Sequence, residues 1–542
     1  MSSPTSGVKV RMYRQGHGDC FLLAFAGREG RRKRTVYVLI DCGLKPGSEV
    51  NDQKIEAVIN DIHDATNGHV DIVIATHEHQ DHVNGFAKKK NRKHLFDKIT
   101  IGQCWLAWTE DGSDELANAL RERFRDTLVT LAYAQEKVES RNKDSDLAAR
   151  LSDLLSTETG DDGRPVKPGE EGRGILEAFR MEKKANPFLT TSELAASAVR
   201  GITNKNAIKY LRNRSEESTV YLSPDSPPAS IPLVKDLRIY TLGPPRNEAL
   251  LVDLDPVGDE EFHLGLSGRN RNLGGDTRGF AQAVATDTAT NAEFQPFSKR
   301  HGIPQDDILT RTLPNASAGA QSSQQARLDY LRQVYGGTGP DENDEATDWR
   351  RIDEEWLGTA EGLALRLNNE VNNTSLVLAF QLPKTGKVLL FTGDAQRGSW
   401  IGWSDLEWTD DENRTTTVRD LLARCVLYKV GHHGSHNATL NGTSADDHAN
   451  LGWMARGEFA DDFVAMIPAN TPWALGKSKP WMHPLPQIEE ALTKKTRGRV
   501  FRSDRDAIEQ PDEAVMCTAE WQAFKKLCKE TKLYFEYSVE DR

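Results

Sequence analysis

The chain has no long apolar run and few cysteines for its size. Its longest hydrophobic stretches, SLVLAF and VLLF, have the length of strands, far short of the roughly 18 apolar residues of a membrane-spanning helix. The opening residues MSSPTSGVKVRMYR lack the apolar core of a secretory signal. Six cysteines are spread over 542 residues without a CxxC pair. These absences argue against a membrane protein and a secreted disulfide scaffold, and we expect a cytoplasmic protein with buried thiols.

Net charge and composition leave several functional classes open. The formal net charge of −12 argues against a protein coated in nucleic acid, although it leaves room for a local basic groove. A hydrophobic content of 37% and a charged content of 28% are typical of a globular protein with some solvated stretches. The length allows two to four domains, or one large domain that carries insertions.

Short apolar runs predict a layered α/β fold in two separated halves. The spacing of Ile55, Val58, Ile59 and Ile62 predicts an amphipathic helix over residues 53–63. A helix between strands that end in polar loops favours an α/β layered arrangement. The predicted strands lie at residues 8–14, 20–27, 34–43, 70–76, 236–245, 374–382, 387–394, 425–431, 463–470 and 499–503, with a helix at 486–495.

Two long segments interrupt these halves. Helical periodicity over residues 114–141, 144–155 and 174–185 predicts a mainly helical insertion, and residues 192–214 could form a packed helix pair. A polar stretch rich in Gly, Asn, Asp and Ser predicts a second, partly disordered insertion. The expected division is 1–105 for the first half, 106–234 for the helical insertion, 235–245 for a further strand, 246–348 for the polar insertion, 349–510 for the second half and 511–542 for a C-terminal extension.

A dense group of histidines follows the predicted strand at 70–76. His77, His79, Asp81 and His82 stand within six residues of a chain that has 14 histidines in all. Imidazole and carboxylate groups are ligands of zinc, iron and manganese. In a loop, His77 and His79 can point toward one ion, while Asp81 and His82 turn toward a second. Two ions about 3.5–4 Å apart form the usual clamp for hydrolysis of phosphate esters.

Two more polar groups occupy the ends of predicted strands. Asp394 follows the run VLLF in the sequence TGD, where its carboxylate could bridge two ions. His432 and His433 follow the run CVLYKV in the sequence GHHGS. Three such sites at strand ends favour one shared metal centre over three unrelated turns.

With these motifs the chain resembles the metallo-β-lactamase superfamily, whose HxHxDH motif is matched by His77 to His82. It is most similar to soluble relatives of the hydrolase domain attached to the competence DNA-uptake channel ComEC. The shared features of that branch are Gly16-His17-Gly18-Asp19, Ile40-Asp41-Cys42-Gly43, Asn372-Asn373-Thr374-Ser375, Thr392 to Ala395, His432 to Ser435 and His483-Pro484. The resemblance covers residues 1–105, 235–245 and 365–505, which is under half of the chain.

The resemblance implies a four-layer αββα sandwich with two divalent metal ions, zinc or manganese, at one edge of its sheets. His77 and His79 would hold the first ion, and Asp81 and His82 the second. Asp394 would bridge the two ions, and either His432 or His433 would complete the second site. Asp41 would orient a ligand imidazole. The surrounding residues would be Asp19 and His17, and the residues expected to take part in catalysis are Asp81, Asp394 and His483.

One feature of the superfamily has no counterpart here. Many members carry another histidine between HxHxDH and the bridging aspartate, where it completes the first metal site. His17 or His483 could take its place. Otherwise the first ion would be weakly held, and a mononuclear enzyme stays an open alternative.

Local charge favours a phosphate-containing substrate. Shortly after the motif from His77 to His82 come five cations in six residues: Lys88, Lys89, Lys90, Arg92 and Lys93. A second basic group comprises Lys494, Lys495, Arg497 and Arg499. Cations beside a metal edge would bind a polyanion, and binding would weaken with salt. Tryptophans near the motifs could stack on bases or pack in the core; they are Trp105, Trp108, Trp400, Trp403, Trp473 and Trp481.

The leading hypothesis is a bacterial, cytoplasmic phosphodiesterase or nuclease that uses metal-activated hydroxide. One alternative is hydrolysis of an uncharged ester, thioester or lactam. A third hypothesis is an effector or scaffold subunit of a multiprotein complex, such as a bacterial defence assembly. In that case the helical insertion would dock a protein partner.

Overall fold

The computed structural model describes residues 1, 4–48, 54–88, 94–142, 146–160, 203–262, 325–327, 329–330, 359–477 and 480–542. The chain divides into two compact units. The first comprises Met1–Asp126, Ser152–Asn270 and Leu365–Arg542, and the second comprises Thr127–Leu151 and Arg271–Ala364. Two sheets and all the motifs named above lie in the first unit, which is therefore the unit of functional interest.

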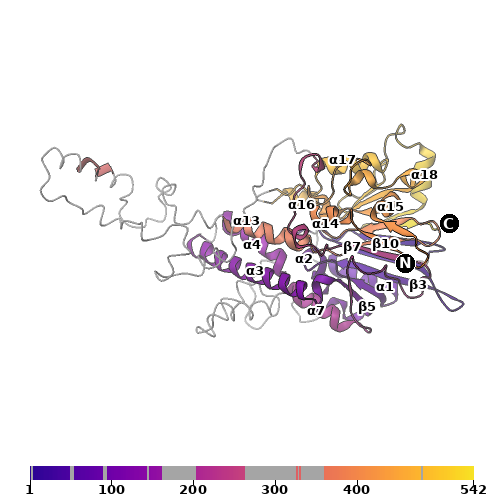
Figure 1. Ribbon diagram of the computed structural model, residues 1–542, viewed down its shortest axis with the longest axis horizontal. Helices are drawn as coiled ribbons and strands as arrows, with labels where there is room; N and C mark the ends of the chain where they lie inside the picture. Colours follow the sequence, from indigo (N-terminus) through magenta and orange to yellow (C-terminus); the bar gives the residue numbers. More distant parts are fainter. Residues whose placement is uncertain are drawn as a thin grey trace. The chain divides into compact units, whose positions relative to one another are not determined.

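The first sheet has eight strands in the order β15-β16-β1-β2-β3-β4-β5-β6. Pairing is antiparallel from β15 to β3 and parallel from β3 to β6. The strands are β1 Val8–Tyr13, β2 Cys20–Glu29, β3 Arg32–Cys42, β4 His69–Ile74, β5 Thr100–Ala107, β6 Val220–Leu222, β15 Cys528–Glu530 and β16 Tyr534–Val539. The two chain ends lie near each other in Figure 1 because β1 pairs with β16.

The second sheet has six strands in the order β14-β13-β12-β9-β8-β7. Strands β9, β12, β13 and β14 run parallel, whereas β7 and β8 complete the sheet in antiparallel pairs. The bounds are β7 Arg238–Gly243, β8 Val377–Gln381, β9 Val388–Phe391, β12 Cys425–Lys429, β13 Val464–Ile467 and β14 Val500–Arg502. A separate small sheet pairs β10 Glu407–Thr409 with β11 Thr415–Thr417.

One apolar cluster is built from both large sheets. In β2 the side chains of Phe21 and Phe25 join it, and their rings meet Phe391 and Phe380 of the second sheet at centroid distances of 5.6 and 6.0 Å. Leu22, between them in sequence, belongs to a different cluster. This period of two is the pattern of a strand buried on both faces.

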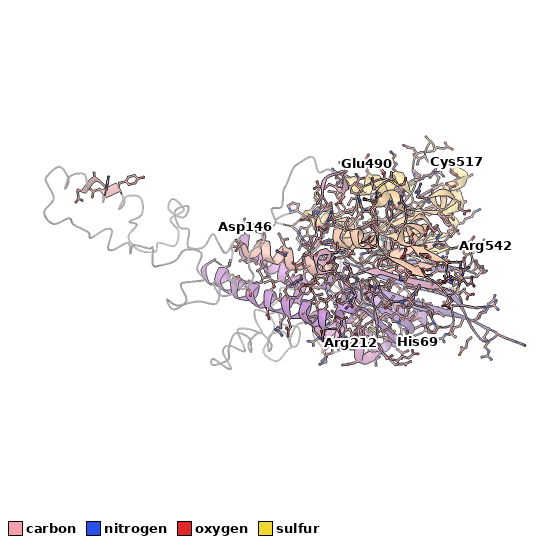
Figure 2. All side chains as sticks on the ribbon, in the orientation of Figure 1. His69, Asp146, Arg212, Glu490, Cys517 and Arg542 are labelled. Atoms are coloured by element: carbon pink, nitrogen blue, oxygen red, sulfur yellow. The ribbon has the colours of Figure 1, made fainter. Side chains whose placement is uncertain are left out.

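Helices cover the other face of each sheet. Ile55, Val58, Ile59 and Ile62 of α1 (Lys54–Thr66) pack in the cluster that contains Leu22. On the second sheet, a third cluster includes side chains of α14 (Arg397–Trp403), α15 (Val418–Ala423) and α17 (Pro486–Lys495). In Figure 2 the labelled His69 and Arg212 lie on one side of the sheets, and Glu490 of α17 lies on the other. The protein is thus of the mixed α/β class.

The remaining helices have the following bounds: α2 Gln80–Val83, α3 Glu115–Asn142, α4 Asp146–Thr159, α7 Thr203–Arg214, α8 Glu248–Leu251, α13 Thr359–Asn372, α16 Thr471–Leu475 and α18 Thr518–Lys526. Within the second unit, Arg150 pairs with Glu361 at 3.0 Å. None of the described helices combines the length and the apolar character that crossing a membrane requires.

Most predicted elements that fall on described residues are confirmed. The helices predicted at 53–63, 114–141, 144–155 and 486–495 correspond to α1, α3, α4 and α17. The predicted helix at 174–185, the first half of the pair at 192–214 and most of the polar insertion lie outside the described residues. Residues 511–542, expected only as an extension, form α18, β15 and β16, and the two strands belong to the first sheet.

Candidate metal centre

The motif residues follow the carboxyl ends of neighbouring strands. Asp41 lies at the end of β3, and the segment from His77 to His82 follows β4. In the second sheet Asp394 follows β9, and a 3₁₀ helix at Gly431–Gly434 follows β12. Figure 1 shows α2, α14 and α16 at this same end of the sheets. Crevices outside the carboxyl ends of parallel strands are the usual ligand sites of α/β folds.

Two glycines allow these loops to approach closely. A Cβ atom on Gly43 would lie 2.3 Å from the backbone of Asp81 and His82. Gly393 has φ +52°, and a Cβ atom there would lie 2.9 Å from the Cβ of Ser375. Any larger residue would separate the loops at these points. The glycines of the IDCG and TGD motifs therefore bring the ligand-bearing backbone segments together.

His82 is fully buried between two carboxylates. Its Nδ1 lies 2.8 Å from Oδ2 of Asp41, and its Nε2 lies 3.2 Å from Oδ2 of Asp394. Burial lowers the pKa of His82, but Asp394, Asp19 and Asp41 outweigh it and raise this pKa well above its usual range. These three carboxylates therefore stabilise a positive charge at the position of His82 Nε2.

Asp41 fixes the segment from Thr76 to His82 through hydrogen bonds to both of these residues. Its Oδ1 accepts the Thr76 amide hydrogen at 2.8 Å, and its Oδ2 accepts the Thr76 hydroxyl hydrogen at 2.7 Å. Asp41 has φ +56°, a left-handed conformation that Asp and Asn tolerate better than most residues. With the bond to His82, one carboxylate fixes both the loop backbone and the orientation of a candidate ligand.

His77 has one nitrogen engaged and the other without a partner. Its Nδ1 lies 3.1 Å from Thr76 Oγ1 and 3.2 Å from Ser375 Oγ, whereas its buried Nε2 has no hydrogen-bond partner. Burial, together with His82 and His79, lowers the pKa of His77 well below its usual value. A neutral imidazole with a free lone pair is the form that binds metal.

The geometry distinguishes the two histidines of the GHHGS motif. His433 directs Nδ1 to the carbonyl oxygen of Pro468 at 2.8 Å and Nε2 to Oδ2 of Asp81 at 3.1 Å. His432 instead places its Nε2 3.2 Å from Nδ2, the side-chain amide nitrogen of Asn372. Both residues have positive φ, 41° and 53°, a strained conformation that often marks functional sites. His433 is thus the member of the pair that points at the carboxylates.

Two clusters of donor atoms satisfy the spacing of a metal site. Each cluster has all its donors within 4.8 Å of one another; one comprises Asp19, His82, Asp394 and His433, and the other comprises His17, Asp81 and His433. His77 and His79 belong to neither cluster, although their rings lie 4.7 Å apart and His77 lies 4.2 Å from the ring of His82.

Unsatisfied donor atoms test whether a metal ion fits here. Nε2 of His77, Nε2 of His82, Oδ1 of Asp81 and Oδ1 of Asp394 are all buried without a hydrogen-bond partner. Buried polar atoms in folded proteins almost always have a partner or a bound ion. Nitrogen and carboxylate oxygen donors suit several divalent metals. The buried His and Asp residues could therefore hold a metal ion.

Two buried lysines accompany this cluster. The Lys429 ammonium group pairs with Asp19, donates to the carbonyl oxygen of Gly393 at 2.7 Å and lies 3.5 Å from Oδ1 of Asp394. Burial opposes its charge, but Asp19 and Asp394 raise the pKa of Lys429. Lys45 lies 3.8 Å from Oδ1 of Asp81. The four aspartates of this cluster (19, 41, 81 and 394) outnumber the two lysines, and a divalent ion would offset this excess of negative charge.

His17 and His483 are partners of each other. Nδ1 of His17 accepts the amide hydrogen of Asn470 at 3.2 Å, and its Nε2 lies 3.3 Å from Nδ1 of His483. The ring of His17 also packs against His433 at a centroid distance of 4.2 Å. Both nitrogens of His17 therefore have partners, and His483 lines the adjoining cavity.

A cavity of about 320 Å³ opens over these residues. Asp81, Asp394 and His433 line it together with Lys45, Trp481 and Asn372. Its volume lies at the small end of the range for ligand sites, roughly 300–1,000 Å³. The cavity is therefore of a size for a small molecule or for one unit of a polymer.

The basic groups have different surroundings. Of the run after the metal loop, Lys88 is described, whereas Lys89, Lys90, Arg92 and Lys93 lie outside the described residues. In the second group, Arg499 is buried and donates to the carbonyl oxygens of Phe463 and Ala460, and Arg497 pairs with Glu520 at 2.8 Å. These two arginines therefore hold the fold together.

The tryptophans near the motifs fall into two groups, one in the apolar clusters and one beside His17. Trp105, Trp108, Trp400 and Trp403 are at most 2% exposed and belong to the apolar clusters. Trp473 and Trp481 instead lie beside His17, at ring centroid distances of 5.0 and 6.3 Å. Stacking against a substrate is thus restricted to Trp481, which lines the cavity, and its neighbour Trp473.

Three charged residues of the site, Lys429, Lys45 and Glu158, are not among those predicted from the sequence. Lys429 ends an otherwise apolar strand, and Lys at a buried strand position is itself a signal, because Lys is almost never buried unless it is paired. Lys45 and Glu158 had no such signal. Glu158 lies on α4, and its Oε1 is 2.9 Å from Nε2 of His79.

Comparison with protein-family models gives no match, and no curated protein matches the chain at a significant level.

Proposed function

We propose that the protein is a metal-dependent hydrolase of phosphodiesters, built on the four-layer αββα sandwich of the metallo-β-lactamase superfamily. The observation that carries the proposal is the convergence of Asp81, His82, Asp394 and His433 from three segments of the chain, with Asp81, Asp394 and His433 lining one cavity. The shared core of two mixed sheets, with helices on their outer faces, agrees with such a sandwich.

In this proposal the ligands divide between two ions, zinc or manganese, as in the superfamily that the motifs resemble. His77 and His79 would hold one ion, while Asp81, His82 and His433 would hold the other, with Asp394 between them. Bound divalent ions supply Lewis acidity, which stabilises charge on a scissile phosphoryl group and makes a nucleophile available at neutral pH.

The chain's own residues prepare this site. Asp41 accepts a hydrogen bond from Nδ1 of His82 and so turns Nε2 of that ring toward Asp394. Ser375 accepts the amide hydrogen of Asp394 at 2.9 Å, which fixes the loop of the central carboxylate. His483 borders the cavity, where it could exchange a proton with a leaving group.

Lys45 supports a charged substrate over an uncharged one. The residue is 6% exposed and lines the cavity, and its ammonium group lies near Asp81. Burial lowers the pKa of Lys45, and a phosphate bound in the cavity would stabilise its charged form. An ester or lactam without charge would gain nothing from this buried cation.

The test is hydrolysis of bis(p-nitrophenyl) phosphate and of linear and circular DNA and RNA, with zinc or manganese. His82→Ala is the inactive variant, and His63→Ala, which replaces an exposed histidine beside Asp64, is its matched control. We expect metal-dependent cleavage by the parent and the control but not by His82→Ala. Cleavage of p-nitrophenyl acetate or a chromogenic lactam, without cleavage of any phosphodiester, would instead establish the uncharged-substrate alternative.

A further inference from the structure

Three of the candidate ligand histidines share one arrangement. His77, His82 and His433 each direct Nδ1 toward an oxygen away from the centre, at 3.1, 2.8 and 2.8 Å. The opposite nitrogen, Nε2, is then left to face the other candidate ligands. In metal sites the second ring nitrogen almost always donates to a carboxylate, a carbonyl or another acceptor, which fixes the ring and its tautomer.

His79 has the same arrangement with its two nitrogens exchanged. Its Nε2 lies 2.9 Å from Oε1 of Glu158, so Nδ1 is the nitrogen left for a ligand role. Both side chains are buried, with exposures of 2% for His79 and 4% for Glu158. A buried carboxylate needs a hydrogen-bonded or charged partner, and this imidazole is one.

The end of α4 that carries Glu158 is held in place by contacts from four parts of the chain. Lys477 pairs with Asp153 at 2.7 Å, and Lys45 donates to the hydroxyl of Thr157. Asn204 donates to the carbonyl oxygens of Thr157 and Glu158 at 2.8 and 3.1 Å, and Asn368 donates to that of Leu154 at 3.1 Å. Its position beside His79 is therefore built into the fold.

We propose that Glu158 is the positioning residue for His79, so that the last turns of α4 form part of the metal centre. The carboxylate accepts the Nε2–H of His79 and holds Nδ1 toward the first ion. This inference rests on the proposed metal site. It also addresses the first site's missing histidine: a ligand fixed by a buried carboxylate binds more tightly than a free one.

The test measures binding of cobalt(II), whose visible absorption reports ligand geometry, by competition with a chelator. Glu158→Ala should weaken one of the two cobalt-binding events about 10–100-fold and change its absorption spectrum, because His79 loses its acceptor. Glu158→Gln keeps an oxygen that can accept the Nε2–H but removes the charge. We expect it to restore most of the spectrum and part of the affinity.

Glu78→Gln is the matched control. Glu78 lies between His77 and His79 in sequence, but its carboxylate pairs with Lys205 at 3.8 Å. We expect this variant to keep the parent's affinity and spectrum. Circular dichroism of each metal-free variant checks folding, so that a loss of cobalt binding is assigned only to folded protein.

The outcomes separate this inference from the proposed function. Parent affinity and spectrum in both Glu158 variants would overturn the role of Glu158, even if the parent cleaves phosphodiesters. Weakened cobalt binding in the variants, with no hydrolysis by the parent, would support Glu158 and reject the function. A parent chain that binds no cobalt would overturn both.

Discussion

His82 and His79 lie three residues apart in one loop, yet carboxylates of different origin orient them. Asp41, the partner of His82, ends a strand of the first sheet and also holds the backbone of Thr76. Glu158, the partner of His79, lies on α4, which belongs to the segment expected from sequence as an insertion. In the proposed metal centre, one candidate ligand thus depends on the sheet and the other on the added helix.

This difference changes how the helical segment should be regarded. Under the third hypothesis from sequence, the helical insertion at residues 106–234 would dock a protein partner. The contacts of Glu158 with His79 and of Thr157 with Lys45 make the end of α4 part of the site itself. Removal of the whole segment would therefore disturb the metal centre as well as any docking.

The largest effect is expected where both halves meet. Asp394→Ala removes the carboxylate that lies 3.2 Å from His82 and 3.7 Å from His433. We expect activity to fall more than about 100-fold, beyond the usual effect of removing a residue that only orients a ligand. Metal content by atomic emission and the rate of phosphodiester cleavage are the measurements. Asp64→Asn, an exposed change, should leave both unaltered.

Asp41→Asn tests the sheet-based half alone. Asn tolerates the positive φ of this position, so the change removes charge with little backbone cost. We expect about 10–100-fold weaker binding of the ion held by His82. We also expect a loss of about 1–3 kcal/mol of stability, since Asp41 accepts two hydrogen bonds from Thr76. Chelator competition and denaturant unfolding measure the two effects.

The effect of Asp41→Asn on cobalt binding is compared with the effect of Glu158→Gln. If Asp41→Asn and Glu158→Gln weaken the same cobalt-binding event, the two halves act on one ion and the comparison fails. If each variant weakens a different cobalt-binding event, the two carboxylates act on different ions.

Local patterns predicted the sheet-based half well. Strand periodicity gave β1 to β4 and β7 to β9, because their apolar side chains alternate or run without interruption. The histidines after β4, the aspartate after β9 and the GHHG segment after β12 are close in sequence to those strands. Their common position at strand ends follows from the direction of parallel strands.

The added half could not be predicted in this way. Glu158 is 79 residues from His79, and nothing in the local sequence of α4 distinguishes it from other glutamates on helices. Strand β15 was also missed, because Cys528–Glu530 is short and polar and its place is fixed by pairing with β16. Long-range pairing leaves no periodic signal.

Lys45 lies at the boundary of the two halves, and its replacement tests substrate charge when cobalt affinity is measured beside activity, because Lys45 also bonds Thr157 of α4. Lys45→Met keeps much of the side-chain volume and removes the buried cation near Asp81. We expect kcat/KM for a phosphodiester to fall about 10-fold, the value of one hydrogen bond to a charged group. Hydrolysis of an uncharged ester should change little, and Lys235→Met, at an exposed site, serves as control. Equal losses on both substrates would argue against a phosphate contact.

The smallest effect is expected from excision of residues 161–202, which would test docking without touching Glu158. The ends of this segment meet: a Cβ atom on Gly160 would lie 2.9 Å from the Cβ of Thr203, so a linker of a few glycines can close the chain. The excised protein keeps α4, α7 and the bonds from Asn204 to Thr157 and Glu158. We expect cobalt affinity and hydrolysis within about 3-fold of the parent, since the contacts proposed to orient His79 are retained. A loss as large as that of Glu158→Ala would place further determinants of the metal centre in the excised residues. Unchanged chemistry would instead leave residues 161–202 as the part of the insertion in which to seek a protein partner.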